Sequence, residues 1–377
     1  MADKSPAQHR IEMRNIRKEF PGMVALDDVS FSLNAGEVHA LLGENGAGKS
    51  TLIKILTGAL ASDGGEILLE GSPVVFATTG DAQAVGISTV YQEVNLIPAM
   101  SVTKNLSIEK LYGKFGHISW KACRAYARQK LARLGLDIDI EQPVGTYSIA
   151  IQQMIAIARA LDDETKVLVL DEPTASLDAH ETAALFKVIK DLRAKGMAIV
   201  FITHFLDQVY ALSDRITVLR NGQITGTGLA ADINRQDLIT MMIGRDLGDI
   251  EHAISANKQG SQTEVVLSAK GLGKKRVLEP FDLDLRKGEA VGLAGLLGSG
   301  RTEMAKIIFG ALKHDCGTLS LGGKDVGQLN PRTALDAGMA FCPEDRKAEG
   351  LIGELSVREN IIMSMQVKRG WLTRVPQ

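Results

Sequence analysis

The 377-residue chain lacks several features that would place it in common classes of protein. It has no uncharged apolar run long enough to cross a bilayer, and residues 1–6 (MADKSP) contain no apolar core of a signal peptide. Its net charge of −2 gives no basic excess for nucleic acid. Its three cysteines, Cys123, Cys316 and Cys342, include no Cys-x-x-Cys pair. These absences predict a cytosolic protein in a reducing compartment, whose membrane role, if any, comes through a partner.

The most informative stretch is residues 41–51, LLGENGAGKST, which fits the Gly-x-x-x-x-Gly-Lys-Ser/Thr pattern of a phosphate-binding loop. The apolar residues 38–42 predict a strand before the loop, and those after it predict a helix. Glycines let backbone N–H groups point at phosphate oxygens, while Lys49 supplies positive charge and Ser50 a hydroxyl ligand for Mg²⁺. We therefore predict nucleotide binding by Gly43, Glu44, Asn45, Gly46, Ala47, Gly48, Lys49, Ser50 and Thr51.

Two later apolar runs end in residues suited to nucleotide hydrolysis. Residues 166–172 (KVLVLDE) predict a buried parallel strand, with Asp171 near Mg²⁺ and Glu172 placed to polarise the attacking water. Residues 196–204 (GMAIVFITH) predict another such strand. A lone histidine is usually structural, but after a phosphate loop and an acidic strand end we expect His204 to contact the γ-phosphate.

Two further residues carry weaker signals. Gln92 follows a predicted strand at residues 85–90, and its amide could bind Mg²⁺ or position water. Phe20 precedes the phosphate loop and could stack on an adenine ring, or it could be an ordinary core aromatic. Neither residue would predict a function on its own.

The chain also contains an internal repeat. Residues 36–71 align without a gap with residues 288–323, so that Gly43 falls on Gly295 at an offset of 252. A repeat of this length indicates a duplicated domain rather than a solenoid. Between the copies, residues 246–263 are polar with little apolar pattern and are predicted to be a linker.

The second phosphate loop, residues 295–302 (GLLGSGRT), differs from the first. Arg301 stands at the lysine position, while Thr302 keeps a hydroxyl group. A planar guanidinium does not replace a compact ammonium in a tight phosphate cradle. We therefore predict that the second site binds nucleotide and hydrolyses it poorly.

Together these patterns predict an α/β fold. Residues 11–28 alternate polar and apolar, which indicates an antiparallel edge ribbon. Residues 107–136 have a helical pattern, which indicates a helical insert between the two halves of the sheet.

The motifs in this order resemble those of the ATP-binding cassette (ABC) family. The resemblance covers residues 10–245 and implies a P-loop NTPase fold with a mixed-sheet core, an antiparallel β-subdomain and a helical insert, which binds ATP and Mg²⁺. It also implies site roles for Gln92 in the glutamine loop, Ser148 in the signature stretch, Asp178 in the D-loop and His204 as the switch histidine.

A narrower resemblance is to the ATPase subunits of bacterial monosaccharide importers of the ribose, galactose and xylose type. It rests on the tandem cassettes, the degenerate second loop and residues 343–347 (PEDRK); residues 203–210 and 369–372 are most similar to the galactofuranose importers among them. The resemblance implies an integral membrane sugar permease as partner and, indirectly, a periplasmic sugar-binding protein. It further implies a peripheral position on the cytoplasmic face of the bacterial inner membrane.

The sequence departs from the family pattern in two places. The family signature is Leu-Ser-Gly-Gly-Gln, whereas residues 147–151 read YSIAI and keep only the serine. This stretch would face the Arg301 loop across a cassette dimer, formed in cis or as a homodimer. The second copy, residues 264–377, contains no second signature, acidic strand end or switch position, so we expect an incomplete second cassette.

The predicted function is therefore an ATP-binding and ATP-hydrolysing subunit that energises monosaccharide import through a separate permease. The alternative is a truncated remnant that binds ATP without significant turnover. A soluble tandem cassette acting on the ribosome or DNA is opposed by the lack of basic segments.

Overall fold

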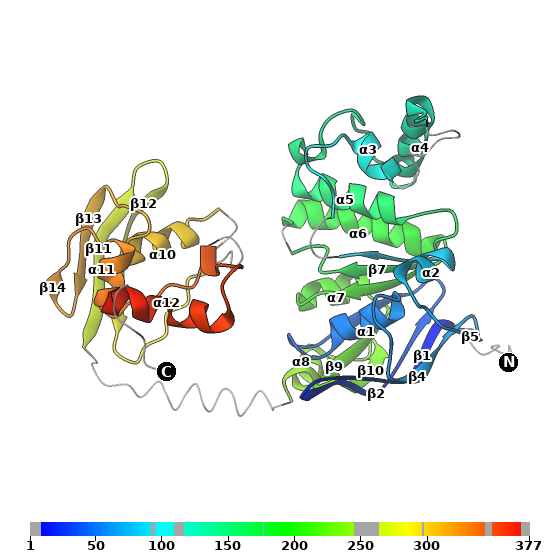
Figure 1. Ribbon diagram of the computed structural model, residues 1–377, viewed down its shortest axis with the longest axis horizontal. Helices are drawn as coiled ribbons and strands as arrows, with labels where there is room; N and C mark the ends of the chain where they lie inside the picture. Colours follow the sequence, from blue (N-terminus) through cyan, green and yellow to red (C-terminus); the bar gives the residue numbers. More distant parts are fainter. Residues whose placement is uncertain are drawn as a thin grey trace. The chain divides into compact units, whose positions relative to one another are not determined.

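The computed structural model of the protein describes residues 9–91, 95–108, 117–175, 177–244, 264–295, 298–343 and 349–370. The chain divides into two compact units, residues 1–253 and 254–377, which are described separately (Figure 1). The predicted linker, residues 246–263, lies outside the described residues. Within the described ranges, every helix is too short or too polar to traverse a lipid bilayer.

The first unit is built around a six-stranded sheet with the strand order β10-β9-β3-β8-β7-β6. Its central strands are parallel, and β10 pairs antiparallel with β9. The strands predicted at residues 38–42, 85–90, 166–172 and 196–204 are present. The six strands are β3 (Val38–Leu42), β6 (Ile87–Val90), β7 (Val167–Asp171), β8 (Ala198–Ile202), β9 (Arg215–Arg220) and β10 (Gln223–Leu229).

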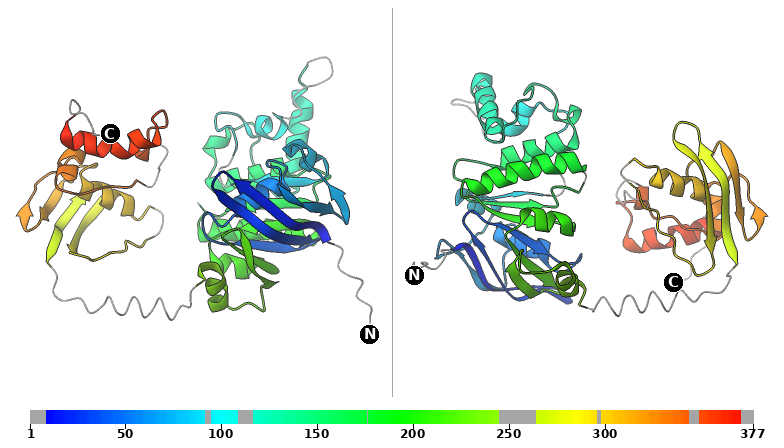
Figure 2. Two further views of the ribbon diagram at one scale, coloured as in Figure 1. Left: turned by 60° about the horizontal axis from the view of Figure 1, so that its bottom comes forward. Right: turned by 180° about the vertical axis from the view of Figure 1, so that it is seen from behind.

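A second, antiparallel sheet of the first unit has the order β2-β1-β4-β5 and lies on the opposite side of α1 (Lys49–Leu56) from α5 (Ile149–Ala160) and α6 (Ala179–Ala194) (Figures 1 and 2). The edge ribbon predicted at residues 11–28 lies within the β1–β2 hairpin, at one edge of this sheet. The strands are β1 (His9–Phe20), β2 (Met23–Asn34), β4 (Gly64–Leu69) and β5 (Ser72–Val74).

The predicted helical insert is present between β6 and β7. Its pattern over residues 107–136 does not form one continuous helix: α3 (Val102–Ser107) ends where the pattern begins, and α4 (Trp120–Ala132) starts later. The physical reason is the cap at Ser119, whose hydroxyl accepts a hydrogen bond from the backbone N–H of Ala122 and so starts a new helix. The remaining helices are α2 (Thr79–Ala84), α7 (Leu206–Leu212) and α8 (Arg235–Ile243), with a 3₁₀ turn at Val144–Thr146.

Strand β7 shows how the sheet is buried on both faces. Val167 and Val169 belong to one apolar cluster, which includes residues of α1 and of the antiparallel sheet. Leu168 and Leu170 belong to another, which includes residues of α3, α5 and α6. Because successive side chains point to opposite faces, the four apolar residues of β7 contribute to both clusters.

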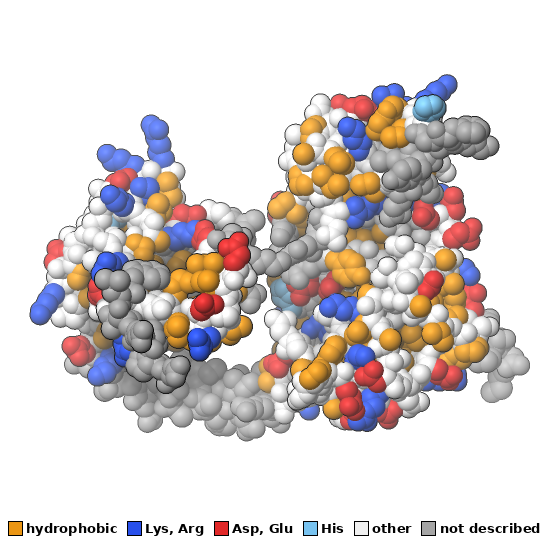
Figure 3. All heavy atoms as spheres, viewed as in Figure 1, with side chains coloured by type: hydrophobic (Ala, Val, Ile, Leu, Met, Phe, Trp, Pro, Cys, Tyr) orange, Lys and Arg blue, Asp and Glu red, His pale blue; other side chains and the backbone are white. Residues whose placement is uncertain are grey.

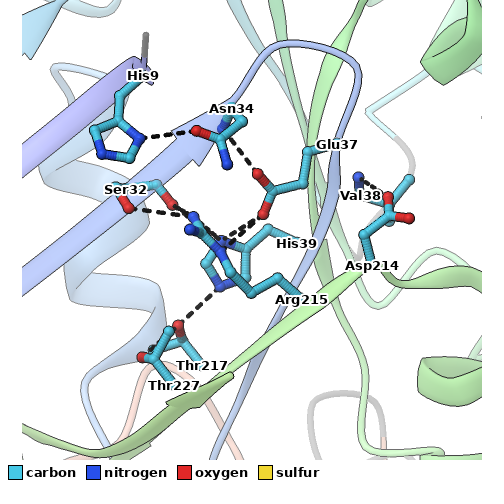
Figure 4. A network of polar contacts seen from close by, with 10 residues as sticks. All are labelled: His9, Ser32, Asn34, Glu37, Val38, His39, Asp214, Arg215, Thr217 and Thr227. Atoms are coloured by element: carbon cyan, nitrogen blue, oxygen red, sulfur yellow. Dashed lines mark hydrogen bonds and ion pairs between the residues drawn. The ribbon is translucent and has the colours of Figure 1, made fainter. Parts of the chain in front are cut away.

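A buried polar network lies at the start of β3, the strand that leads into the phosphate loop (Figure 4). Arg215 of β9 pairs with Glu37 at 2.9 Å, and its guanidinium lies 3.2 Å from Nδ1 of His39. His39 Nε2 lies 2.8 Å from Oγ1 of Thr217. Burial, with the Arg215 charge, lowers the pKa of His39 to about 3, so this imidazole is neutral at physiological pH. The network links the start of β3 to the start of β9.

The second unit contains one antiparallel sheet with the order β12-β11-β13-β14 and three described α-helices. Its strands are β11 (Val265–Lys274), β12 (Leu278–Arg286), β13 (Cys316–Leu321) and β14 (Lys324–Asp325). Its helices are α10 (Arg301–Phe309), α11 (Pro331–Asp336) and α12 (Val357–Arg369).

Candidate functional site

The first phosphate loop runs between β3 and α1, and its glycines are required by close backbone contacts. Gly43 has a φ of 147°, and a Cβ atom there would lie 2.1 Å from the carbonyl oxygen of Leu219. Gly48 has a φ of 107°, and its Cβ atom would lie 2.7 Å from the carbonyl oxygen of Ala25. Gly48 also precedes α1 without a side-chain cap, so the helix N–H groups can receive an anion.

Lys49, the first residue of α1, is folded back over the loop. Its Nζ donates hydrogen bonds to the carbonyl oxygens of Gly43 at 2.7 Å and Glu44 at 3.0 Å. Burial lowers the pKa of Lys49, and the nearby charges of Glu172 and Asp171 oppose this shift. The ammonium group is thus held within the loop, close to two carboxylates.

A cavity of about 370 Å³ lies over the loop. The hairpin of β1 and β2, the phosphate loop and the end of β7 all contribute to its wall. Phe20, for which the sequence left open a base stack or a core aromatic, is 40% exposed and lies in this wall rather than in the core. The predicted site residues that line the cavity are Phe20, Asn45, Gly46, Gly48, Lys49, Ser50, Thr51, Asp171 and Glu172.

Asp171 and Glu172 lie at the end of β7, and His204 follows the adjacent strand β8. Glu172 has a φ of 46°, which is uncommon outside glycine, and its N–H donates to the carbonyl oxygen of Ile202 at 2.9 Å. Glu172 Oε1 lies 3.3 Å from Nδ1 of His204. Burial and the charge of Glu172 raise the pKa of Asp171. The structure therefore brings Asp171, Glu172 and His204 to one edge of the sheet.

Other predicted residues of the first unit are not among the described residues that line this cavity: Gly43, Glu44, Ala47, Gln92, Ser148, Asp178 and His204. Gln92 lies outside the described residues. Ser148 caps α5, where its hydroxyl accepts a hydrogen bond from the N–H of Ile151 at 3.4 Å. Asp178 caps α6, where its carboxylate accepts one from the N–H of Glu181 at 2.8 Å. Nucleotide contacts of Gln92, Ser148 and Asp178 therefore stay predictions.

The second phosphate loop leads into a helix, α10, as the first leads into α1, but its cationic residue is not buried to the same extent. Arg301 and Thr302 open α10 after Gly300, which has a φ of 90°. Arg301 is exposed, whereas Lys49 is half-buried. Residues 296–297 of this loop lie outside the described residues.

The residues of the first cavity fit a magnesium-bound nucleotide. Ser50 and Asp171 both line it, and hydroxyl and carboxylate oxygens are the ligands that Mg²⁺ prefers. The uncapped N-terminus of α1 and the charge of Lys49 suit phosphate groups, and the exposed ring of Phe20 suits a base.

Comparison with known proteins identifies the family. The sequence profile described as ABC transporter matches residues 26–175 and 278–376. The chain belongs to the ABC transporter family. The two matched regions agree with the tandem duplication that the sequence repeat indicated, and the ABC fold class predicted from the sequence is confirmed.

Curated relatives of this ABC protein have names that refer to sugar import. The galactofuranose transporter ATP-binding protein YtfR of Escherichia coli (strain K12) is 49% identical over 366 residues, covering 97% of this chain and 73% of the relative. The fructose import protein FruK of Bifidobacterium longum is 47% identical, covering 100% of this chain and 74% of FruK. The ribose import protein RbsA 1 of Rubrobacter xylanophilus is 44% identical, covering 94% and 70%.

Solved structures support the ABC fold. The ADP conformation of an ATP-binding cassette of an ABC transporter has a TM-score of 0.56 at 28% identity, covering 65% of this chain and 98% of that one. A nucleotide-free ATP-binding cassette has a TM-score of 0.55 at 29% identity, covering 62% and 94%. Nearly the whole of each solved cassette therefore has a counterpart in this chain.

The sequence analysis missed two parts of this ABC site. Met23 and Ala25 also line the cavity, and the only signal for them was their place in the ribbon next to Phe20. Thr174, two residues after Glu172, is hydrogen-bonded to Gln208, four residues after His204. No sequence motif linked this second pair.

Proposed function

We propose that this chain is the ATP-binding and ATP-hydrolysing subunit that energises import of a monosaccharide through a separate membrane permease. The observation that carries the proposal is the meeting of Lys49, Ser50, Asp171 and Glu172 in one cavity wall, in a chain whose relatives have names that refer to sugar import. Those names do not favour the alternative of a remnant without turnover.

In this proposal the phosphate loop, residues 43–51, binds the phosphate groups of ATP through its N–H groups and through Lys49. Phe20 stacks on the base. Ser50 and Asp171 would hold Mg²⁺, with Gln92 as a further ligand. The bound ion would supply positive charge that offsets the negative charge of the phosphate oxygens.

Glu172 then accepts a hydrogen bond from the attacking water and polarises it. Its side chain is 20% exposed, which is dry enough to strengthen its interactions yet open to the cavity. His204, at 3.3 Å from Glu172, contacts the γ-phosphate and keeps the carboxylate oriented. Gln92 reports the state of the γ-phosphate to the helical insert.

The second cassette plays a supporting part in this proposal. Arg301 and Thr302 bind nucleotide and turn it over poorly, because the guanidinium is exposed and planar. Ser148 and Asp178 contact the nucleotide of a partner cassette, in cis or in a homodimer. We place the cassettes at residues 10–245 and 264–377.

The proposed partners are an integral membrane sugar permease and, through it, a periplasmic sugar-binding protein. The chain would lie at the cytoplasmic face of the inner membrane, docked through the surface near Gln92 and the helical insert. On the face that Figure 3 shows, acidic and basic described side chains are interspersed, which fits a protein partner better than nucleic acid.

The experiment is sugar uptake by right-side-out or reconstituted vesicles that contain the permease and this chain, with ATP inside and the sugar-binding protein supplied outside. We expect ATP-dependent accumulation of one monosaccharide, abolished by Glu172→Gln. Uptake that proceeds without the chain, or equally with Glu172→Gln, would rule the proposal out.

A further inference from the structure

The two catalytic candidates lie on different loops, so something must hold those loops together. Glu172 follows β7 and His204 follows β8, and the contact between their side chains is 3.3 Å. His204 is 55% exposed, and the ring it packs against, that of Phe205, is itself 40% exposed. A support behind the two loops is needed to keep this geometry.

Gln208, in the first turn of α7, lies where such a support is required. Its Oε1 accepts a hydrogen bond from the hydroxyl of Thr174 at 2.6 Å and another from the hydroxyl of Thr203 at 3.2 Å. Thr174 is two residues after Glu172, and Thr203 directly precedes His204. One carbonyl oxygen thus joins the loop of the acid to the loop of the histidine.

Both threonines are buried, with Thr174 3% and Thr203 4% exposed. Buried hydroxyls that lose their acceptor lose stability, so the loops are held in the position where both can reach Gln208. Thr203 Oγ1 also accepts from the N–H of Phe205 at 3.1 Å, and Thr174 O accepts from the N–H of Leu177 at 3.1 Å. These bonds connect the bridge that Gln208 forms between Thr174 and Thr203 to the start of α7 and to the segment before α6.

A purely local role for Gln208 would be to cap α7. That role accounts for the contact with Thr203, which precedes the helix. It does not account for the shorter contact with Thr174, which is 34 positions away on another loop. We propose that Gln208 is a positioning residue that makes the Glu172 and His204 loops move as one body. The inference rests on the proposed function only for its effect on turnover.

The first test is hydrogen exchange at the N–H groups of Ala175 and Leu177, which bond to the carbonyl oxygens of Glu172 and Thr174 in the loop across from Gln208. In the full chain, Gln208→Leu should speed their exchange about tenfold or more, because it removes the acceptor on the other loop. Gln208→Glu keeps an acceptor oxygen and should stay within about twofold of the wild type.

Two controls sharpen this test. Gln223→Leu removes an exposed glutamine of β10 whose amide bonds to Asp27, and it should leave exchange at Ala175 and Leu177 unchanged. Thr174→Val removes the cross-loop bond from the other end and should reproduce Gln208→Leu, while Thr174→Ser should not. This second pair keeps the proposal testable if Gln208→Leu fails to fold.

The second test is ATP turnover. Gln208→Leu should lower kcat about tenfold while KM for ATP changes less than about twofold, and Gln208→Glu should restore kcat. Unchanged exchange in Gln208→Leu, or equal acceleration in Gln208→Glu, would overturn the bridge. A wild-type chain that hydrolyses no ATP with its permease would instead overturn the proposed function, while the exchange measurement would still decide the role of Gln208.

Discussion

The two units have helices and strands in matching positions, but they differ at the strand that precedes the phosphate loop. At the offset of 252 residues, α1 corresponds to α10, α2 to α11 and β4 to β13, each beginning at the matching residue. Residues 290–294, which match β3, form no strand. In the first unit β3 is hydrogen-bonded between β8 and β9. No described residues of the second unit supply such parallel neighbours.

The comparison separates local from distant causes of structure. Helix caps and turns recur because they depend on residues close in sequence; Thr78 caps α2 and Asn330 caps α11, each in a capping box. A central parallel strand depends on partners far along the chain. Val291 and Leu293 are accordingly 40% exposed, whereas every residue of β3 is buried.

The largest expected difference between the units is in ATP turnover. Lys49→Ala removes the half-buried cation of the first loop and should lower turnover about 100-fold or more. Arg301→Ala removes an exposed group and should change turnover less than about threefold. Steady-state phosphate release by the chain with its permease measures both, and equal losses would make the two loops functionally alike.

The next difference concerns the loop glycines. Gly43→Ala forces a Cβ atom against the carbonyl oxygen of Leu219 at a positive φ, and we expect it to destabilise the first unit by about 3 kcal/mol. At Gly295 the nearest atom to such a Cβ is Oγ of Ser299 at 2.4 Å, which can rotate away, and the φ is not positive, so Gly295→Ala should cost less than about 1 kcal/mol. Calorimetric unfolding of the two variants checks this ranking, and its reversal would contradict this account of how the two loops pack.

A third comparison uses a matched pair of asparagines. Asn105 bonds to the backbone of Ile97, Met100 and Ser101, and Asn360 bonds in the same way to Ile352, Leu355 and Ser356. Asn105 is fully buried and Asn360 is half-buried. Asn105→Ala should therefore cost about 2 kcal/mol or more, and Asn360→Ala about 1 kcal/mol. Urea unfolding of both variants tests whether burial sets the difference.

A further difference is the dependence of stability on pH that His39 gives to the first unit. His39, which aligns with Val291, has its pKa lowered to about 3 in the folded state. Below the ordinary pKa of about 6.5, His39 binds a proton in the unfolded chain but stays neutral in the folded one. The free energy of unfolding therefore falls as the pH falls. From pH 7 to 5 this amounts to about 2 kcal/mol.

The variant His39→Gln cannot titrate, so the part of the acid destabilisation that His39 causes should be absent from it. Urea unfolding gives the loss of stability from pH 7 to pH 5 for the wild type and for the variant, and the wild type should lose more. Parallel curves for the two proteins would show that His39 titrates normally in the folded state.

Much of the first unit could be predicted from the sequence because its signals are local. The apolar runs that end at Asp171 and His204 predicted two strands and two site residues, since burial on both faces requires continuous apolar sequence. The helical insert was predicted as well, but the pattern over residues 107–136 does not show that Ser119 starts a new helix. The bond between Thr174 and Gln208 joins distant positions through side chains that carry no periodic signal.

The most direct test of the account is the effect of Glu172→Gln on ATP binding and turnover by the chain reconstituted with the proposed permease. The substitution keeps the shape of the side chain and removes its negative charge. If the first cassette is the hydrolytic one, turnover should fall about 100-fold or more while the affinity for Mg-ATP changes less than about threefold. Turnover that survives the substitution would contradict the account, because hydrolysis would then take place at a site other than the one built by Lys49, Asp171 and Glu172.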